Sequence, residues 1–167
     1  MSWRLPVEGK TALREHGLPP GRTDELSGVV GEPQESADAV PGPGGRGVYL
    51  LGSCGDTQLA AVEESGEVVA FPVFATEQAT AVNSTLAALV ECAWRWHWLL
   101  PLLADEQERA GVAEIAAWKD GRLREGFPEP YGVYQDLCAG VLGRFREIDP
   151  TLSDDSNFWV DVIVDVW

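Results

Sequence analysis

Positive charge is scarce in this sequence, which has 12 lysine and arginine side chains, 27 aspartate and glutamate side chains and a formal net charge of −15. Binding to DNA or RNA phosphates needs clustered Lys and Arg, so the composition argues against a nucleic-acid-binding protein. The same negative field repels anionic membranes and attracts basic partners over about a Debye length. The alternative interpretation is that the acidity only maintains solubility.

Cysteine and histidine are also rare, with three and two copies respectively. Cys54, Cys92 and Cys138 are odd in number and far apart in the sequence. They therefore match neither a disulfide framework nor a zinc-ligand spacing, as is typical of proteins in the reducing cytosol. The N-terminus has no apolar run of signal-peptide length. We expect a cytoplasmic protein without a bound metal or cofactor.

Long uninterrupted apolar runs are missing as well. The most apolar window, residues 81–103, contains Asn83, Glu91, Arg95 and His97. A membrane span tolerates such side chains poorly, so this window predicts an amphipathic helix buried in the core.

The chain of 167 residues has the length of a single domain. A short helix is predicted over Thr11–His16 and ends at Gly17. Residues 21–47 are rich in Gly, Pro and acidic side chains. We expect them to form a long, partly mobile surface loop, interrupted by a short strand at Gly28–Val30.

Three short apolar runs follow this loop and predict strands, at Val48–Gly52, Gln58–Val62 and Glu67–Phe71. The last two runs are joined by the four residues 63–66, with a glycine at the end, which is typical of a β-hairpin.

The second half of the chain predicts helices. Asn83 suits the N-cap of a helix that Pro101 ends or kinks. Further helices are predicted over Asp105–Trp118, Pro130–Ile148 and Asp154–Trp167. Strands followed by a run of helices indicate a single α+β domain.

Catalytic patterns are hard to find. Cys54 lies in a glycine-flanked loop, but a nucleophile needs a base within hydrogen-bond reach, and the only histidines are His16 and His97. The glycines of residues 42–47 lack the Gly-Lys-Ser/Thr ending of a phosphate-binding loop. The sequence therefore predicts no catalytic, cofactor-binding or metal-binding residue, and a Cys54-dependent enzyme stays as an alternative.

Two groups of side chains are candidates for binding a partner protein. Three tryptophans occupy alternate positions from 94 to 98. Because tryptophan is enriched at interface hot spots, they predict an aromatic contact for a partner. The alternative is a helix that is packed on all sides, with the tryptophans in the core. Residues 147–167 carry six acidic side chains and no Lys or Arg. With two glutamates of the predicted hairpin turn, they predict an acidic docking face, and a solvated surface is the alternative. The predicted partner-binding residues are Glu63, Glu64, Trp96, Trp98, Asp154, Asp155, Asp161 and Asp165.

A series of short motifs runs along the chain: Ala12–Pro19 with its Gly-Leu-Pro turn, Tyr49–Gly52, the hairpin of residues 58–71, Val82–Leu86, and Phe158-Trp159. In this order they resemble the SUKH superfamily and, within it, the SUKH-4 immunity proteins. The resemblance implies a mixed or antiparallel sheet with flanking helices. It also implies a bacterial immunity protein that binds and neutralises a cognate polymorphic toxin.

The toxins of such systems include nucleases and nucleic-acid deaminases, which tend to be basic. An inhibitor with a net charge of −15 would complement them and steer their association. We therefore expect a monomer that occludes a basic toxin stoichiometrically. The resemblance carries over no catalytic residue. A SUKH-type interaction or regulatory module with the same fold is the alternative.

Overall fold

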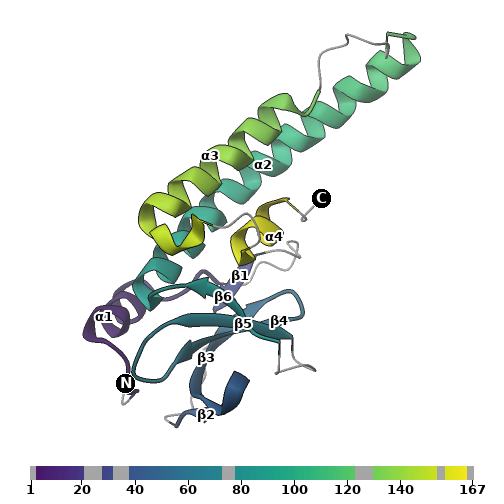
Figure 1. Cartoon of the computed structure of the whole chain (residues 1–167). Helices are drawn as coiled ribbons and strands as arrows, with labels where there is room; N and C mark the ends of the chain where they lie inside the picture. Colours follow the sequence, from purple (N-terminus) through teal and green to yellow (C-terminus); the bar gives the residue numbers. More distant parts are fainter. Residues whose placement is uncertain are drawn as a thin grey trace.

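An antiparallel six-stranded sheet and four helices form the framework of the computed structural model (Figure 1). The structure describes residues 3–20, 28–31, 38–72, 78–122, 130–153 and 157–164. Across the sheet the strands follow the order β1-β3-β4-β5-β6, and β2 also pairs with β3. The strands are β1 (Val29–Gly31), β2 (Val40–Pro41), β3 (Gly47–Cys54), β4 (Thr57–Val62), β5 (Val68–Pro72) and β6 (Thr80–Asn83).

The central strands confirm the predicted apolar runs, because β3 and β4 each contain one run and β5 contains all of the third run except Glu67. Successive side chains of a strand point to opposite faces of its sheet. Leu59 and Ala61 of β4 join the main core, whereas Ala60 and Val62 join a smaller apolar cluster. Burial on both faces explains why these strands are continuously apolar instead of alternating with polar residues.

The segment 21–47 contains more regular structure than its composition predicts. β1, β2 and a short 3-10 turn, η1 (Pro43–Gly45), form within it. β1 confirms the strand expected near Gly28–Val30 and pairs with the end of β3. Residues 21–27 and 32–37 of this segment lie outside the described residues.

The helices fall into two groups in Figure 1, where α2 and α3 run side by side and extend well beyond the sheet, while α1 and α4 stay close to it. α1 packs against α2, whereas α4 packs against α3 and β6. The bounds are α1 (Val7–Glu15), α2 (Leu86–Lys119), α3 (Gly132–Ile148) and α4 (Phe158–Val164), with a 3-10 turn η2 (Pro150–Ser153) before α4. The α+β fold class predicted from the sequence is confirmed.

α2 corrects two of the predictions. It is one helix of 34 residues that continues through Pro101, so the predicted end of the helix at Pro101 and the separate helix after it are wrong, while the alternative of a kink stays a prediction. Proline removes one backbone hydrogen bond, but the helix is held on both sides of it by buried Trp96 and Leu103. The N-cap is Thr85, whose hydroxyl accepts a hydrogen bond from the amide of Ala88 at 3.2 Å, while Asn83 ends β6 instead.

Asp149, just after α3, ties the base of α2 to the C-terminal part of the fold. It is 1% exposed, and its carboxylate accepts hydrogen bonds from Asn83 Nδ2 (3.0 Å), the Ser84 amide (2.7 Å), the Ser84 hydroxyl (3.0 Å) and the Thr151 hydroxyl (2.6 Å). Asn83 in turn accepts a hydrogen bond from Trp159 Nε1 at 3.1 Å. Burial raises the pKa of Asp149, but these hydrogen bonds to its charged form outweigh burial and lower the pKa overall.

Candidate partner-binding surfaces

The turn between β4 and β5 carries Glu63 and Glu64, two of the predicted partner-binding residues. Glu64 adopts a left-handed backbone conformation with φ of 67°, and Gly66 has φ of 72°. The turn is closed by a hydrogen bond from the Gly66 amide to the Val62 carbonyl at 2.9 Å. It is also tied to the N-terminal segment, because the Glu64 amide donates to the Arg4 carbonyl at 2.6 Å.

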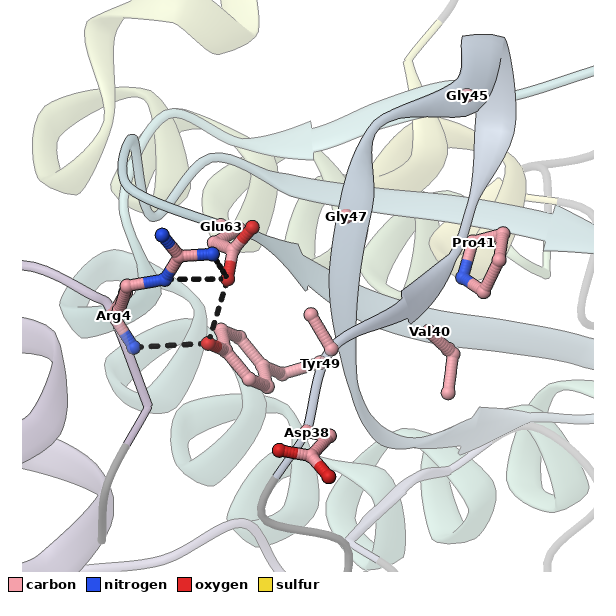
Figure 2. Close-up of a pocket in the computed structure, with 9 residues that line it drawn as sticks. Arg4, Asp38, Val40, Pro41, Gly45, Gly47, Tyr49 and Glu63 are labelled. Atoms are coloured by element: carbon pink, nitrogen blue, oxygen red, sulfur yellow. Dashed lines mark hydrogen bonds and ion pairs between the residues drawn. The ribbon is translucent and has the colours of Figure 1, made fainter.

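Glu63 is held inside a small polar network at the edge of a hollow of about 580 Å³ (Figure 2). Its carboxylate accepts hydrogen bonds from Arg4 Nε at 2.9 Å and from the Tyr49 hydroxyl at 3.0 Å. The Tyr49 hydroxyl also accepts a hydrogen bond from the Arg4 amide at 3.0 Å, and its ring stacks on Trp3. Arg4 therefore offsets the charge of Glu63 at 2.7 Å, whereas its ion pair with Glu64 is longer, 3.9 Å, and leaves the Glu64 side chain 79% exposed.

The three tryptophans of α2 have three different environments. Trp96 is fully buried in the main core. It therefore has no surface to offer a partner, and the structure corrects this prediction. Successive residues of a helix are about 100° apart, so Trp98 lies on a different side of α2 and is 70% exposed. Trp94 is half-buried, and its Nε1 donates to the Gly17 carbonyl at 3.1 Å.

Trp98 stands at a groove between α1 and α2 of about 660 Å³. Its ring lies 6.4 Å from that of Trp94, with an angle of 28° between the ring planes. Glu15 and Glu91 add carboxylates to the groove, and Arg95, which pairs with Glu91 at 2.7 Å, adds the guanidinium. The groove thus combines aromatic faces with carboxylates, a combination that suits a basic side chain with an apolar neighbour.

The acidic C-terminal stretch is only partly at the described surface. Asp161 is exposed on α4, but Asp149 faces the interior and Glu147 pairs with Arg144. The predicted residues Asp154, Asp155 and Asp165 lie outside the described residues. Glu64, Trp98 and Asp161 therefore belong to three different elements, and the structure does not place them in one described cluster.

The largest concentration of exposed apolar side chains was not predicted from the sequence. Val112, Ile115 and Trp118 of α2 are 63%, 54% and 69% exposed. Their spacing of three residues places them in one row on the helix. The buried residues of this part of α2 are the small side chains Ala110 and Ala117. One signal in the sequence could have revealed this row. The second part of α2 carries two apolar stripes, one of small residues (Ala110 and Ala117) and one of large residues (Val112, Ile115 and Trp118).

A family model for the SUKH-4 immunity protein matches residues 1–165 of the chain. The chain belongs to the SUKH-4 immunity protein family. This confirms the family resemblance of the sequence motifs. Neither a curated protein nor a solved structure gives a significant match. Membership associates this SUKH-4 chain with immunity against toxins, and the surfaces described above are where a toxin partner can be sought.

Most arginines in the described part of this SUKH-4 chain are held by neighbouring carboxylates. Six arginines form seven ion pairs: Arg4 with Glu63 and Glu64, Arg46 with Glu67, Arg95 with Glu91, Arg109 with Glu106, Arg122 with Asp120 and Arg144 with Glu147. Eight exposed carboxylates form no ion pair with another described residue: Glu8, Glu15, Asp56, Asp105, Glu108, Glu114, Asp136 and Asp161. The exposed charge that remains available is therefore mainly negative.

The chemistry of Cys54 argues against a nucleophile. Burial raises the pKa of its thiol to about 11, and a catalytic cysteine needs a lowered pKa that yields the thiolate. Across the described ranges, no group of three or more His, Cys, Asp or Glu side chains is arranged to hold a metal ion. In the same ranges, no helix combines the length and the apolar character needed to cross a membrane.

Proposed function

We propose that this SUKH-4 chain neutralises a basic toxin domain, a nuclease or nucleic-acid deaminase, by binding it one-to-one and covering its nucleic-acid-binding cleft. The observation that carries the proposal is the distribution of charge. The net charge of the sequence is −15, and because six arginines are already paired with carboxylates, the unpaired exposed charge of the described residues is mainly negative. Such a surface imitates the polyanion that a nuclease or deaminase binds, and it accelerates association with a basic protein.

The contact residues of this proposal are those predicted positions that are exposed. Trp98 supplies an aromatic anchor beside the groove, and Glu64 and Asp161 supply carboxylates. Asp154, Asp155 and Asp165 remain sequence predictions for the same acidic face. Glu63 contributes to binding indirectly, because it pairs with Arg4 and thereby maintains the conformation of the turn that carries Glu64.

The test is co-purification of the tagged protein with the toxin domain encoded by the neighbouring gene, followed by an assay of the nuclease or deaminase activity of that domain. We expect a one-to-one complex that abolishes the activity, with an association rate that falls as salt is added. Failure to retain the toxin domain at low salt, where steering is strongest, contradicts the proposal and favours a SUKH-type regulatory module.

The role of Trp98 has a matched control in Val7, an exposed apolar residue on α1 with a nearly equal exposed fraction, 69% against 70%. Loss of a hot-spot side chain costs about 2 kcal/mol or more, so Trp98→Ala is expected to weaken toxin binding by about 30-fold. Val7→Ala is expected to leave the Kd unchanged. Equal Kd values for both variants would remove Trp98 from the interface.

A further inference from the structure

The exposed apolar side chains in the described part of this molecule are concentrated on the pair of helices α2 and α3. Among the residues that the structure describes, seven of the eight exposed large apolar residues lie on α2 from Trp98 onward or at the start of α3, and Val7 of α1 is the exception. Figure 1 shows that this part of α2 and α3 projects away from the sheet as a helical arm. Exposed apolar residues scattered singly are ordinary, but a concentration in one region marks an interaction surface. The seven are Trp98, Leu102, Val112, Ile115, Trp118, Val133 and Leu137.

The row Val112, Ile115 and Trp118, called the arm patch below, is not needed to hold the arm together. In this part of α2 the interior positions are Ala110 and Ala117, which share one face of the helix with Glu114. Glu114 accepts a hydrogen bond from the Tyr131 hydroxyl just before α3 at 3.3 Å, so this face is the one turned toward α3. The arm patch lies on other sides of the helix and is more than half exposed at each of its three residues.

The charges beside the arm patch indicate what kind of partner can cover it. Glu108 lies four residues before Val112, on the same side of α2, and Asp105 lies one turn further back. Both carboxylates are exposed and form no ion pair with another described residue. The nearby Arg109 pairs with Glu106, and the exposed Lys119 at the end of α2 is a cation beside Trp118 that only partly offsets these two carboxylates. A protein surface with an apolar centre and Lys or Arg at its rim complements this arrangement.

A second copy of the chain fits this surface less well. It would bring its own −15 charge and the same Asp105 and Glu108 carboxylates against like charges. A stable dimer also buries about 800 Å² per partner, and an aromatic side chain contributes only about 150–250 Å². Three side chains therefore form an anchor within a larger interface.

We propose that the arm patch docks into an apolar cleft rimmed by basic residues on the toxin domain, so that the helical arm is the element that inserts into the partner. This inference rests on the proposed function and specifies its contact surface. Val112, Ile115 and Trp118 anchor the arm in the cleft, while Asp105 and Glu108 contact the basic rim.

The experiment measures the Kd and the inhibition of the neighbouring-gene toxin domain with the full-length chain and a variant that combines Val112→Ser, Ile115→Ser and Trp118→Ser. All three positions are exposed, so the circular dichroism spectrum and unfolding midpoint of the variant should match those of the wild type. Because each lost anchor weakens binding several-fold or more, we expect the Kd to rise by about 100-fold. The control Val7→Ser, also at an exposed apolar residue, should bind as the wild type does.

The basic rim is tested separately with Ile115→Lys and Ile115→Glu, which remove the same apolar side chain and add opposite charges. A basic partner repels the lysine, so Ile115→Lys should bind about tenfold more weakly than Ile115→Glu. Equal affinities, or the reverse order, overturn the basic character of the cleft.

The outcomes separate this inference from the proposed function. If the wild type neither binds nor inhibits the toxin domain, the proposed function fails and the docking proposal fails with it. If the wild type binds and the triple variant binds equally well, only the docking proposal is overturned. If sedimentation shows a wild-type dimer that the triple variant turns into a monomer, the arm patch is a self-association surface and the docking proposal is wrong.

Discussion

The two halves of α2 show how one helix can serve two purposes. The first half, residues 86–103, buries nine side chains, and the second half, residues 104–119, buries only Ala110 and Ala117. Large apolar residues occur in both halves, but most of those in the first half are buried in the core, with Trp98 and Leu102 as exposed exceptions, whereas those of the second half face solvent. The comparison teaches that the apolar content of a helix does not reveal its role: the first half stabilises the fold and the second half is free to contact a partner.

The second half can stay helical without a large buried face for two reasons. It is rich in Ala, Glu, Gln and Arg, which have high intrinsic helix propensity. It also extends a helix that is already nucleated by the packed first half, and extension costs far less than nucleation.

The strongest way to test the comparison is to remove the same side chain from both halves. Trp96→Ala leaves a cavity in the core, and we expect the free energy of unfolding to fall by about 3–5 kcal/mol. Trp118→Ala changes an exposed position and should stay within about 0.5 kcal/mol of the wild type. Urea unfolding of both variants measures the difference. Similar losses for the two variants would show that the second half is also structurally required.

The substitution Asp149→Asn tests whether the base of α2 is a structural anchor. It places an amide, in place of a carboxylate, among the donors of Asn83, Ser84 and Thr151. Since hydrogen bonds to a charged acceptor contribute about 1.5–3 kcal/mol each, we expect a loss of about 2–3 kcal/mol. Asp161→Asn, at an exposed carboxylate, is the control and should be close to neutral.

The lowered pKa of Asp149 also gives its contribution a pH dependence with a definite sign. The folded state favours the carboxylate, so its stabilisation is present above the unfolded pKa of about 4 and is lost as the pH falls through the lower folded value. Unfolding measured from pH 6 down to pH 3 should show this loss in the wild type. A step of equal size in Asp149→Asn would contradict the assignment.

The smallest expected effect concerns the second half itself, where Ala117 is 1% exposed and its neighbour Ala116 is exposed. Ala117→Leu forces extra volume into a filled space and should cost about 1–3 kcal/mol. Ala116→Leu adds the same volume to solvent and should change stability by less than about 0.5 kcal/mol. Thermal unfolding of the pair decides whether the small-residue stripe is the packed one.

Local sequence patterns predicted the elements well. The apolar runs of β3, β4 and β5, the helix within residues 130–148 and the helix near Phe158 follow from periodicity and turn residues that act over a few positions. The helix break at Pro101 was wrong because the cost of a proline can be outweighed by packing on both sides of it, and packing is not visible in the sequence.

The candidate site was predicted less completely than the fold. The exposure of Trp98 and the burial of Trp96 depend on which side of α2 packs against the rest of the fold. The alternating positions of the tryptophans in the sequence do not show which side this is. The arm patch was missed because larger apolar residues are ordinarily expected to face the interior. Here the close approach of two helices is made by Ala110 and Ala117, and the larger side chains remain outside.

The sequence by itself determined the net charge, the strand and helix types and the membership of the SUKH-4 family, because these depend on composition, short-range periodicity and local motifs. The tertiary structure alone decided which arginines are paired, which tryptophan is exposed and which stripe of α2 is packed. The exposure of the tryptophans, the packed stripe of α2 and the pairs that Arg4 and Arg46 form depend on contacts between residues far apart in the chain, whereas the other four arginine pairs join residues two to four positions apart. Arg4 with Glu63 and Asn83 with Asp149 are pairs that only the folded chain brings together.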